Sequence, residues 1–178
     1  MMDKEEYAII LDYLPYGYPL EKKMMPIAQA VGKKNFTLLE LVPRRGMKFE
    51  VGEEVYIGEG KREKVYYILG KLALSKISEA GKQFLSQHIE KQINDDETRF
   101  VEFFNKAQPI NTRLHQLELL PGFGKKHTNA IIEERENKPF ENFADLRARI
   151  SNLPDPKMAI VKRIMEELKG EERHNLFI

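Results

Sequence analysis

The stretch Leu119–Lys126, with the sequence LLPGFGKK, decides the fold of the C-terminal half of this chain. Its two glycines, Gly122 and Gly124, flank one apolar residue. Because they lack Cβ atoms, they let the backbone turn through positive φ and approach a ligand closely. Aliphatic residues follow at helical spacing over Ala130–Ile132, which predicts a helix directly after the glycines. The unpaired N–H groups at the start of such a helix attract anions, so the stretch predicts a phosphate-binding turn between two helices.

Six residues of this turn and of the helix after it form the candidate phosphate site. Backbone N–H groups near Gly122, Gly124 and Lys126 are expected to contact one phosphate, while the lysines supply charge and a threonine supplies a hydroxyl. The apolar residue between the glycines is expected in the core. None of these groups reads a base, so binding would ignore sequence and weaken with salt. The candidate nucleic-acid-binding residues are Gly122, Phe123, Gly124, Lys125, Lys126 and Thr128.

The composition narrows the classes of function. The chain has 178 residues, 42% of them hydrophobic, which suits one folded domain or two small ones. Its formal net charge of +1 provides no basic field over the whole molecule, so any nucleic-acid binding must be local. The absence of cysteine excludes disulfides, thiolate zinc sites and thiol catalysis. Without a secretory signal or an apolar run of about 20 residues, we expect a cytoplasmic protein with no membrane role.

Residues 1–74 are expected to form a small antiparallel β-barrel domain. Short β-rich runs alternate there with turns of glycine, proline and charged residues. Four or five short strands in about 70 residues are typical of a small barrel. The predicted strands are Tyr7–Leu14, Phe36–Val42, Glu54–Ile57 and Val65–Leu72.

Residues 75–110 are expected to form connecting helices, because the hydrophobic spacing becomes helical there. Ser75 or Ser78 can cap the first helix. The run Asn94–Asp96 interrupts the pattern, and Pro109 ends the second helix.

Residues 111–170 are expected to hold four helices, followed by a tail over residues 171–178. The first of the four carries leucines at helical spacing, and the second follows the glycine hairpin. The predicted starts and ends are Asn111 or Thr112 for the first helix, Asn142 for the third, Asp155-Pro156 for the fourth and Gly170 for its end.

The last four helices contain a weak internal repeat. The sequence LPGFG of Leu120–Gly124 recurs as LPDP at Leu153–Pro156. The second copy lacks both glycines and carries Asp155, whose charge repels an anion. We therefore expect the second turn to serve packing.

The hairpin at Leu120–Gly124 and its helix resemble the helix-hairpin-helix family of DNA-binding modules. The likeness continues through Ala130–Phe140 and Phe143–Leu146, as in the extended form found in bacterial DNA-uptake receptors and nucleotide-excision repair proteins. It covers Asn111–Lys169 and implies a pair of hairpins, the second of them degenerate. It favours DNA over RNA, although phosphate binding alone does not distinguish the two.

The whole chain is similar to an archaeal family of predicted nucleic-acid-binding proteins, which joins an oligonucleotide-binding-like (OB-like) barrel to a helix-hairpin-helix pair. In the N-terminal part, Val51–Tyr56 resembles the entry to a strand of such barrels. The resemblance implies an α+β fold, a small antiparallel OB-like β-barrel followed by an all-α tandem helix-hairpin-helix domain. It implies no particular activity.

Basic pairs in the predicted barrel form a second candidate site. If the intervening strands are antiparallel, the pairs can gather at one edge and form a groove that follows a nucleic-acid backbone, with aromatic rings as stacking platforms. The alternative is that they are solvated loop ends, neutralised by glutamates that follow in the sequence. The basic residues are Lys22, Lys23, Lys33, Lys34, Arg44, Arg45 and Lys48, and the candidate rings are Phe36, Tyr56, Tyr66 and Tyr67.

Catalytic motifs are not found in this sequence. The four histidines lack metal-site spacing, and we expect no cofactor, no metal and no small-molecule substrate. The acidic cluster Asp95–Glu97 is expected to cap a helix; convergence of its carboxylates would instead indicate a metal-dependent nuclease.

The sequence thus predicts a non-enzymatic, sequence-independent binder of DNA or RNA phosphates. The alternative is a protein-interaction module in transcription, repair or ribosome assembly. In that module the degenerate hairpin and the helix around Phe100–Phe104 would present an exposed apolar patch.

Overall fold

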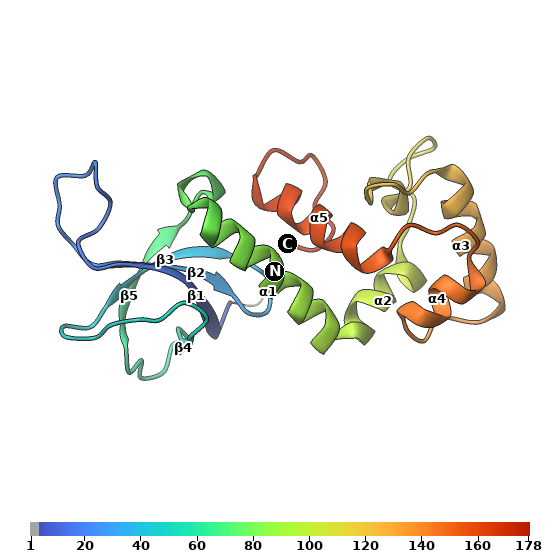
Figure 1. Ribbon diagram of the computed structural model, residues 1–178. Coiled ribbons are helices and arrows are strands. Elements are labelled where there is room, and N and C mark those ends of the chain that lie inside the picture. The colour runs from blue at the N-terminus through green and yellow to red at the C-terminus, as the bar shows by residue number, and fades with distance from the viewer. Residues whose placement is uncertain (1–3) are drawn as a thin grey trace. The chain divides into compact units, whose positions relative to one another are not determined.

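The structure of the protein is a computed structural model that describes residues 4–178 (Figure 1). It confirms an α+β fold with an antiparallel sheet in the N-terminal half and helices after it. The five strands are β1 (Tyr7–Leu14), β2 (Ile27–Gly32), β3 (Leu38–Pro43), β4 (Glu54–Tyr56) and β5 (Val65–Lys71).

The sheet is a curled half-barrel with the strand order β4-β1-β2-β3-β5. All four pairings are antiparallel, and β4 and β5 form its two edges. The register shifts twice between β3 and β5, once at Glu40/Leu41 and once at Val42/Pro43. Such shifts are β-bulges, which bend a strand and increase its twist.

Alternate residues of β1 and β2 fill the inside of this sheet. Ala8 and Ile10 on β1 and Ala28 and Ala30 on β2 are fully buried in one hydrophobic cluster, to which Leu41 of β3 also belongs. Period-two alternation thus places the core on one face, as expected for a strand. The alanines at three of these positions leave room for the sheet to curl.

The strand β2 was missing from the sequence-based prediction. All six of its residues are buried, including Gln29, so it lacks the alternation by which a half-buried strand is recognised. The predicted bounds of β1 are confirmed, and the other three predicted strands differ by one or two residues at their ends.

Five α-helices and two short 3₁₀ helices lie in residues 4–178. Ser78 accepts a hydrogen bond from Gly81 N–H (3.1 Å) and Asn142 accepts one from Asp145 N–H (2.7 Å), so both predicted caps are confirmed. The helices are α1 (Glu79–Asp95), α2 (Glu97–Lys106), α3 (Lys125–Asn137), α4 (Phe143–Arg149) and α5 (Pro156–Leu168), and the 3₁₀ helices are η1 (Leu74–Lys76) and η2 (Gln116–Leu119).

The prediction of a helix that starts at Asn111 or Thr112 is wrong. Asn111 instead accepts a hydrogen bond from Arg113 N–H at 2.8 Å, which makes a local turn. An isolated bridge then pairs Pro109 with His115, and only the 3₁₀ helix η2 follows. The side chain of Asn111 therefore closes a loop and caps no helix.

The described chain forms two compact units. Unit 1 comprises residues up to Gln87 together with Leu168–Ile178, and unit 2 comprises His88–Glu167. The first unit contains the sheet, and the second contains the glycine hairpin. None of the helices in residues 4–178 is long and apolar enough to cross a membrane.

Candidate nucleic-acid interface

The glycine hairpin of unit 2 is a tight turn held by its own backbone. Phe123 N–H donates to the Leu120 carbonyl at 3.0 Å, and Gly122 has φ of +85°. Only glycine adopts such a φ without strain, so the sequence dictates this turn. The Phe123 side chain is buried, and its ring lies 6.0 Å from that of Phe104. Its predicted core position is confirmed.

Gly124 is the N-cap residue of α3 and lies on the surface. Its φ of −113° is open to any residue, and a Cβ added there would meet no atom within 4 Å. Among residues 4–178, no hydrogen-bond acceptor is found for the backbone N–H groups of Gly122, Lys125 or Lys126. Three exposed donors therefore surround an open position at the positive end of a 13-residue helix.

Two of the groups expected to contact a phosphate have hydrogen-bond partners inside the protein. The Thr128 hydroxyl donates to the Gly124 carbonyl at 3.0 Å and is buried, so it serves the helix and does not reach a ligand. The N–H of Gly124 donates to His127 Nδ1 at 3.3 Å. His127 was not among the predicted site residues, although the third position after an N-cap is where side chains commonly return a bond.

Two lysines, Lys125 and Lys126, begin α3 directly after the hairpin. Lys125 Nζ lies 3.3 Å from the Arg113 carbonyl and 3.9 Å from the Glu118 carboxylate. Lys126 is exposed and has no ion-pair partner within the described chain. The approach of the Arg113 backbone to Lys125 was not predicted, and it depends on the turn that the loop makes. Asn111 two residues earlier was the available signal.

The second turn packs against the first. A Cβ at Gly122 would lie 3.3 Å from Cγ of Pro154, and His127 Nε2 lies 3.1 Å from the Asn152 carbonyl oxygen. Asp155 accepts a hydrogen bond from Lys157 N–H at 3.0 Å at the start of α5. The predicted start of this helix at Asp155-Pro156 is confirmed, and the acidic side chain serves the helix.

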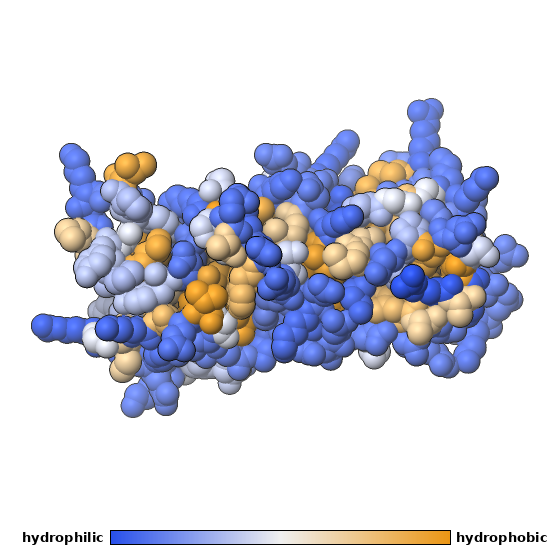
Figure 2. All heavy atoms as spheres, in the orientation of Figure 1, coloured by the Kyte–Doolittle hydropathy of each residue, from blue (hydrophilic) through white to orange (hydrophobic). Residues whose placement is uncertain are grey.

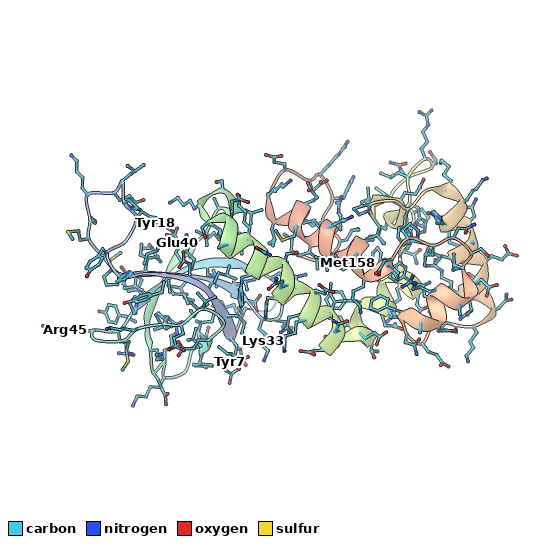
Figure 3. All side chains as sticks on the ribbon, viewed as in Figure 1. Tyr7, Tyr18, Lys33, Glu40, Arg45 and Met158 are labelled. Atoms are coloured by element: carbon cyan, nitrogen blue, oxygen red, sulfur yellow. The ribbon has the colours of Figure 1, made fainter. Side chains whose placement is uncertain are left out.

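In unit 1 the strand register separates the basic pairs. Lys33-Lys34 follow β2 at the end of the sheet where Tyr7 begins β1. Arg44-Arg45 follow β3 at the opposite end, beside the loop that carries Lys22-Lys23. Figure 3 shows Lys33 and Arg45 at these opposite ends. The hypothesis that all three pairs gather at one edge is therefore wrong, and Lys33 instead forms an ion pair with Glu54.

The candidate stacking rings divide in the same way. Phe36 is fully buried and cannot stack on a base. Tyr56 lines a cavity of about 950 Å³ on the inside of the half-barrel, and its hydroxyl accepts a hydrogen bond from Gly60 N–H. Tyr66 and Tyr67 stay exposed near the Arg45 end, with ring centroids 5.4 Å apart. Only these two remain available as platforms.

The acidic cluster has separate partners. Asp95 pairs with Lys91 at 2.9 Å, and Glu97 accepts a hydrogen bond from Phe143 N–H at 2.8 Å. Asp96 takes the N-cap position of α2, but its side chain makes no cap hydrogen bond. Residues 4–178 contain no group of three or more histidine, aspartate or glutamate residues that could hold a metal ion.

The apolar face of α2 is covered. Phe100, Val101 and Phe104 are buried, and the Phe104 ring contacts the rings of Phe123 and Phe143. The exposed patch on which the protein-interaction hypothesis depended is therefore not found on this helix.

Known proteins resemble the chain over nearly its full length. A family model described as "Protein of unknown function (DUF655)" matches residues 4–178. "Uncharacterized protein MJ0038" of Methanocaldococcus jannaschii is 42% identical over 174 residues, which cover 98% of this chain and 79% of that protein. The crystal structure of Af1531 from Archaeoglobus fulgidus has a TM-score of 0.85 and 46% identity, and the match covers 97% of this chain and 99% of that one. The expected similarity to archaeal proteins is thus confirmed.

Proposed function

The chain belongs to the DUF655 family, and we propose that it binds nucleic acid without catalysing a reaction. In this proposal the Leu120–Gly124 turn with α3 acts as a helix-hairpin-helix motif. The motif grips backbone phosphates, with DNA favoured over RNA. The turn at Leu153–Pro156 is its structural counterpart and binds no phosphate.

The observation that carries the proposal is the set of free donors at the start of α3. A phosphate placed beside Gly124 can accept from the N–H groups of Gly122, Lys125 and Lys126, and the helix dipole adds to the attraction. Lys125 and Lys126 supply positive charge at the same end of the helix. Gly124 has no Cβ, and no other atom lies within 4 Å of the place a Cβ would take. The backbone can therefore approach the phosphate closely.

This mode of binding ignores base sequence. Backbone donors and lysines contact phosphate oxygens, which are the same for every nucleotide. Counterion release then makes the affinity fall steeply with salt. The order of strands in unit 1 supports the proposal, because five-stranded, partly open barrels of the OB class bind oligonucleotides.

A pair of substitutions at Gly124 tests the proposal. Aspartate and serine are both good N-cap residues, and a side chain there meets open space, so both variants are expected to fold. G124D places a negative charge where the phosphate would lie and should weaken binding roughly tenfold or more, whereas G124S should weaken it only several-fold. Binding is measured with matched single- and double-stranded DNA and RNA over a salt series. Equal affinity of G124D and the unchanged protein would overturn the proposal.

Gly122 is the wrong residue for this test. Any side chain there is strained at φ of +85° and presses on Pro154 at 3.3 Å. Loss of binding in a Gly122 variant would therefore not distinguish a lost phosphate contact from a lost fold.

A further inference from the structure

Three apolar side chains of the loop between β1 and β2, residues 15–26, are largely exposed and so add little to the core. Leu20 is 99% exposed, Met24 77% and Tyr16 72%. The loop projects from the sheet in Figure 1, and Figure 2 shows hydrophobic and hydrophilic side chains side by side on it. Exposed apolar side chains gathered on one segment mark a binding surface.

A polar network holds the root of this loop. The Tyr18 hydroxyl donates to Glu40 at 2.9 Å and accepts from Gln29 Nε2 at 3.0 Å. Gln29 also donates to the Lys76 carbonyl at 3.2 Å, and the Lys76 ammonium lies 4.9 Å from the centre of the Tyr18 ring. Glu40 and Gln29 are buried in the sheet, so these hydrogen bonds fix the Tyr18 end of the loop to the sheet.

Cations without an acidic partner in the described chain lie on this loop and on the turn after β3. Lys22 and Lys23 lie on the loop, and Arg45 and Lys48 lie on the turn after β3 at the same end of the sheet. All four are exposed, and no acidic partner is found for any of them in residues 4–178. The only acid within the loop, Glu21, lies 3.9 Å from Lys76. This surface therefore suits a polyanion.

We infer that the β1–β2 loop, with Arg45 and Lys48, is a contact for single-stranded nucleic acid. The four cations bind phosphates, and unpaired bases lie against Tyr16, Leu20 and Met24. A duplex keeps its bases stacked inside and presents mainly phosphates, so it offers these side chains much less contact. The inference rests on the proposed function of nucleic-acid binding, but it uses unit 1 and adds the strand class.

A single tryptophan can report stacking directly, because the chain contains none. Y16W places that probe on the loop at a position where the native ring is largely exposed. Saturable quenching of its fluorescence is expected when the intact variant is titrated with a 15-nucleotide single-stranded DNA or RNA. The matched duplex should quench it much less. Binding of the single strand without quenching, or equal quenching by the duplex, would overturn the inference.

A charge-matched pair of variants tests the cations. K22Q/K23Q should weaken single-strand binding and lower the slope of log affinity against log salt by about 1.4, which is the release expected for two phosphate contacts on a single strand. K33Q/K34Q removes the same charge at the other end of the sheet and should leave the slope unchanged. Equal effects of the two variants would indicate a general loss of charge and contradict the inference.

Replacing the apolar side chain of Leu20 tests the base contacts separately from the phosphate contacts. L20S alters a fully exposed side chain, so it should leave thermal stability unchanged. It should weaken single-strand binding about fivefold and duplex binding by less than twofold. An L20S variant that binds single strands as well as the unchanged protein would remove the apolar half of the inference.

The two proposals fail in different ways. If G124D keeps single-strand binding and K22Q/K23Q loses it, the hairpin proposal is wrong and the loop contact stands. If the reverse holds, the loop contact is wrong and the hairpin stands. If neither strand class binds at low salt, both are wrong, and the exposed loop then points to a protein partner.

Discussion

His127 Nε2 lies 3.1 Å from the carbonyl oxygen of Asn152, so one imidazole joins the start of α3 to the turn before α5. Its other nitrogen, Nδ1, accepts from Gly124 N–H at 3.3 Å. The tautomer that carries a proton on Nε2 and none on Nδ1 satisfies both contacts. The two turns of unit 2 therefore form one packed structure, in which Gly122 against Pro154 is a second point of contact.

Replacing His127 with alanine should destabilise unit 2. Both hydrogen bonds are lost, which should lower the free energy of unfolding by about 1–2 kcal/mol. Urea denaturation followed by circular dichroism measures this change. K126A at the neighbouring exposed position is the control and should change stability by less than about 0.5 kcal/mol. If H127A unfolds at the same urea concentration as K126A, the imidazole does not join the two turns.

Lys126 and Lys138 lie at opposite ends of α3 and make a matched pair for binding. K126Q should lower the slope of log affinity against log salt by about 0.7–0.9, because one phosphate contact is lost. K138Q removes the same charge from the C-terminal end of the helix, where it pairs with Glu141 at 2.9 Å, and should leave the slope unchanged. Filter binding or fluorescence anisotropy at several salt concentrations gives both slopes.

Arg149 binds the carbonyls at the C-terminal end of α3, and its replacement by lysine should destabilise the fold. Its guanidinium donates to the Glu134 and Lys138 carbonyls, both at 2.6 Å, and lies 4.4 Å from the centre of the Phe140 ring. Lysine cannot reproduce these planar contacts, so R149K should lower the free energy of unfolding by about 1–3 kcal/mol. R147K, on the exposed side of α4, should change it by less than about 0.5 kcal/mol. Thermal denaturation compares the two, and equal melting temperatures would contradict this role for Arg149.

His115 should make stability depend on pH just below neutrality. Burial lowers the pKa of His115, and the nearby charge of Arg135 lowers it further. The unfolded chain therefore takes up a proton before the folded chain does, so the stabilising contribution is complete above about pH 6.5 and is lost as pH falls. H115N keeps an acceptor for Leu117 N–H, which His115 Nδ1 provides at 3.1 Å, but cannot titrate. Urea denaturation from pH 7.5 to 5 should show a larger loss for the unchanged protein than for H115N.

Tyr18 should show its burial in an alkaline titration. Burial and the nearby carboxylate of Glu40 raise the pKa of Tyr18 to about 12. Because the folded-state value exceeds the unfolded one, this stabilisation is present below about pH 10 and is lost as pH rises through 12. Absorbance at alkaline pH should show one tyrosine ionising later than the others, and Y18F should remove that late step. Y18F should also lower the free energy of unfolding by about 1–3 kcal/mol, since it removes the hydroxyl that donates to Glu40 and accepts from Gln29.

Local chemistry explains why much of the fold was predictable. The caps at Ser78 and Asn142 and the start at Asp155 depend on side chains within three residues of the N–H groups they bind. The strand β1 has bounds that hydrophobic runs and flanking turns indicate. The glycine turn is likewise local, because Gly122 alone permits its φ of +85°.

Features that depend on distant partners were not predictable in the same way. Lys33-Lys34 and Arg44-Arg45 look alike in sequence, yet the pairing of β2 with β3 places them at opposite ends of the sheet. The leucines after Asn111 have helical spacing, but a bridge between Pro109 and His115 prevents the helix. The Thr128 hydroxyl donates to the Gly124 carbonyl because α3 begins directly after Gly124. Hydrophobic periodicity does not show where a helix begins to that precision.

The bulges in the pairing of β3 with β5 should keep the protein soluble. β5 is an edge strand, and its side chains Tyr66 and Leu69 are exposed, which is the composition of a strand that recruits a second copy of itself. Two shifts of register along β3 and β5 bend and twist this edge, so its free N–H and C=O groups do not line up as a flat template. The bulges that bend this edge strand thus protect the protein from strand-to-strand aggregation.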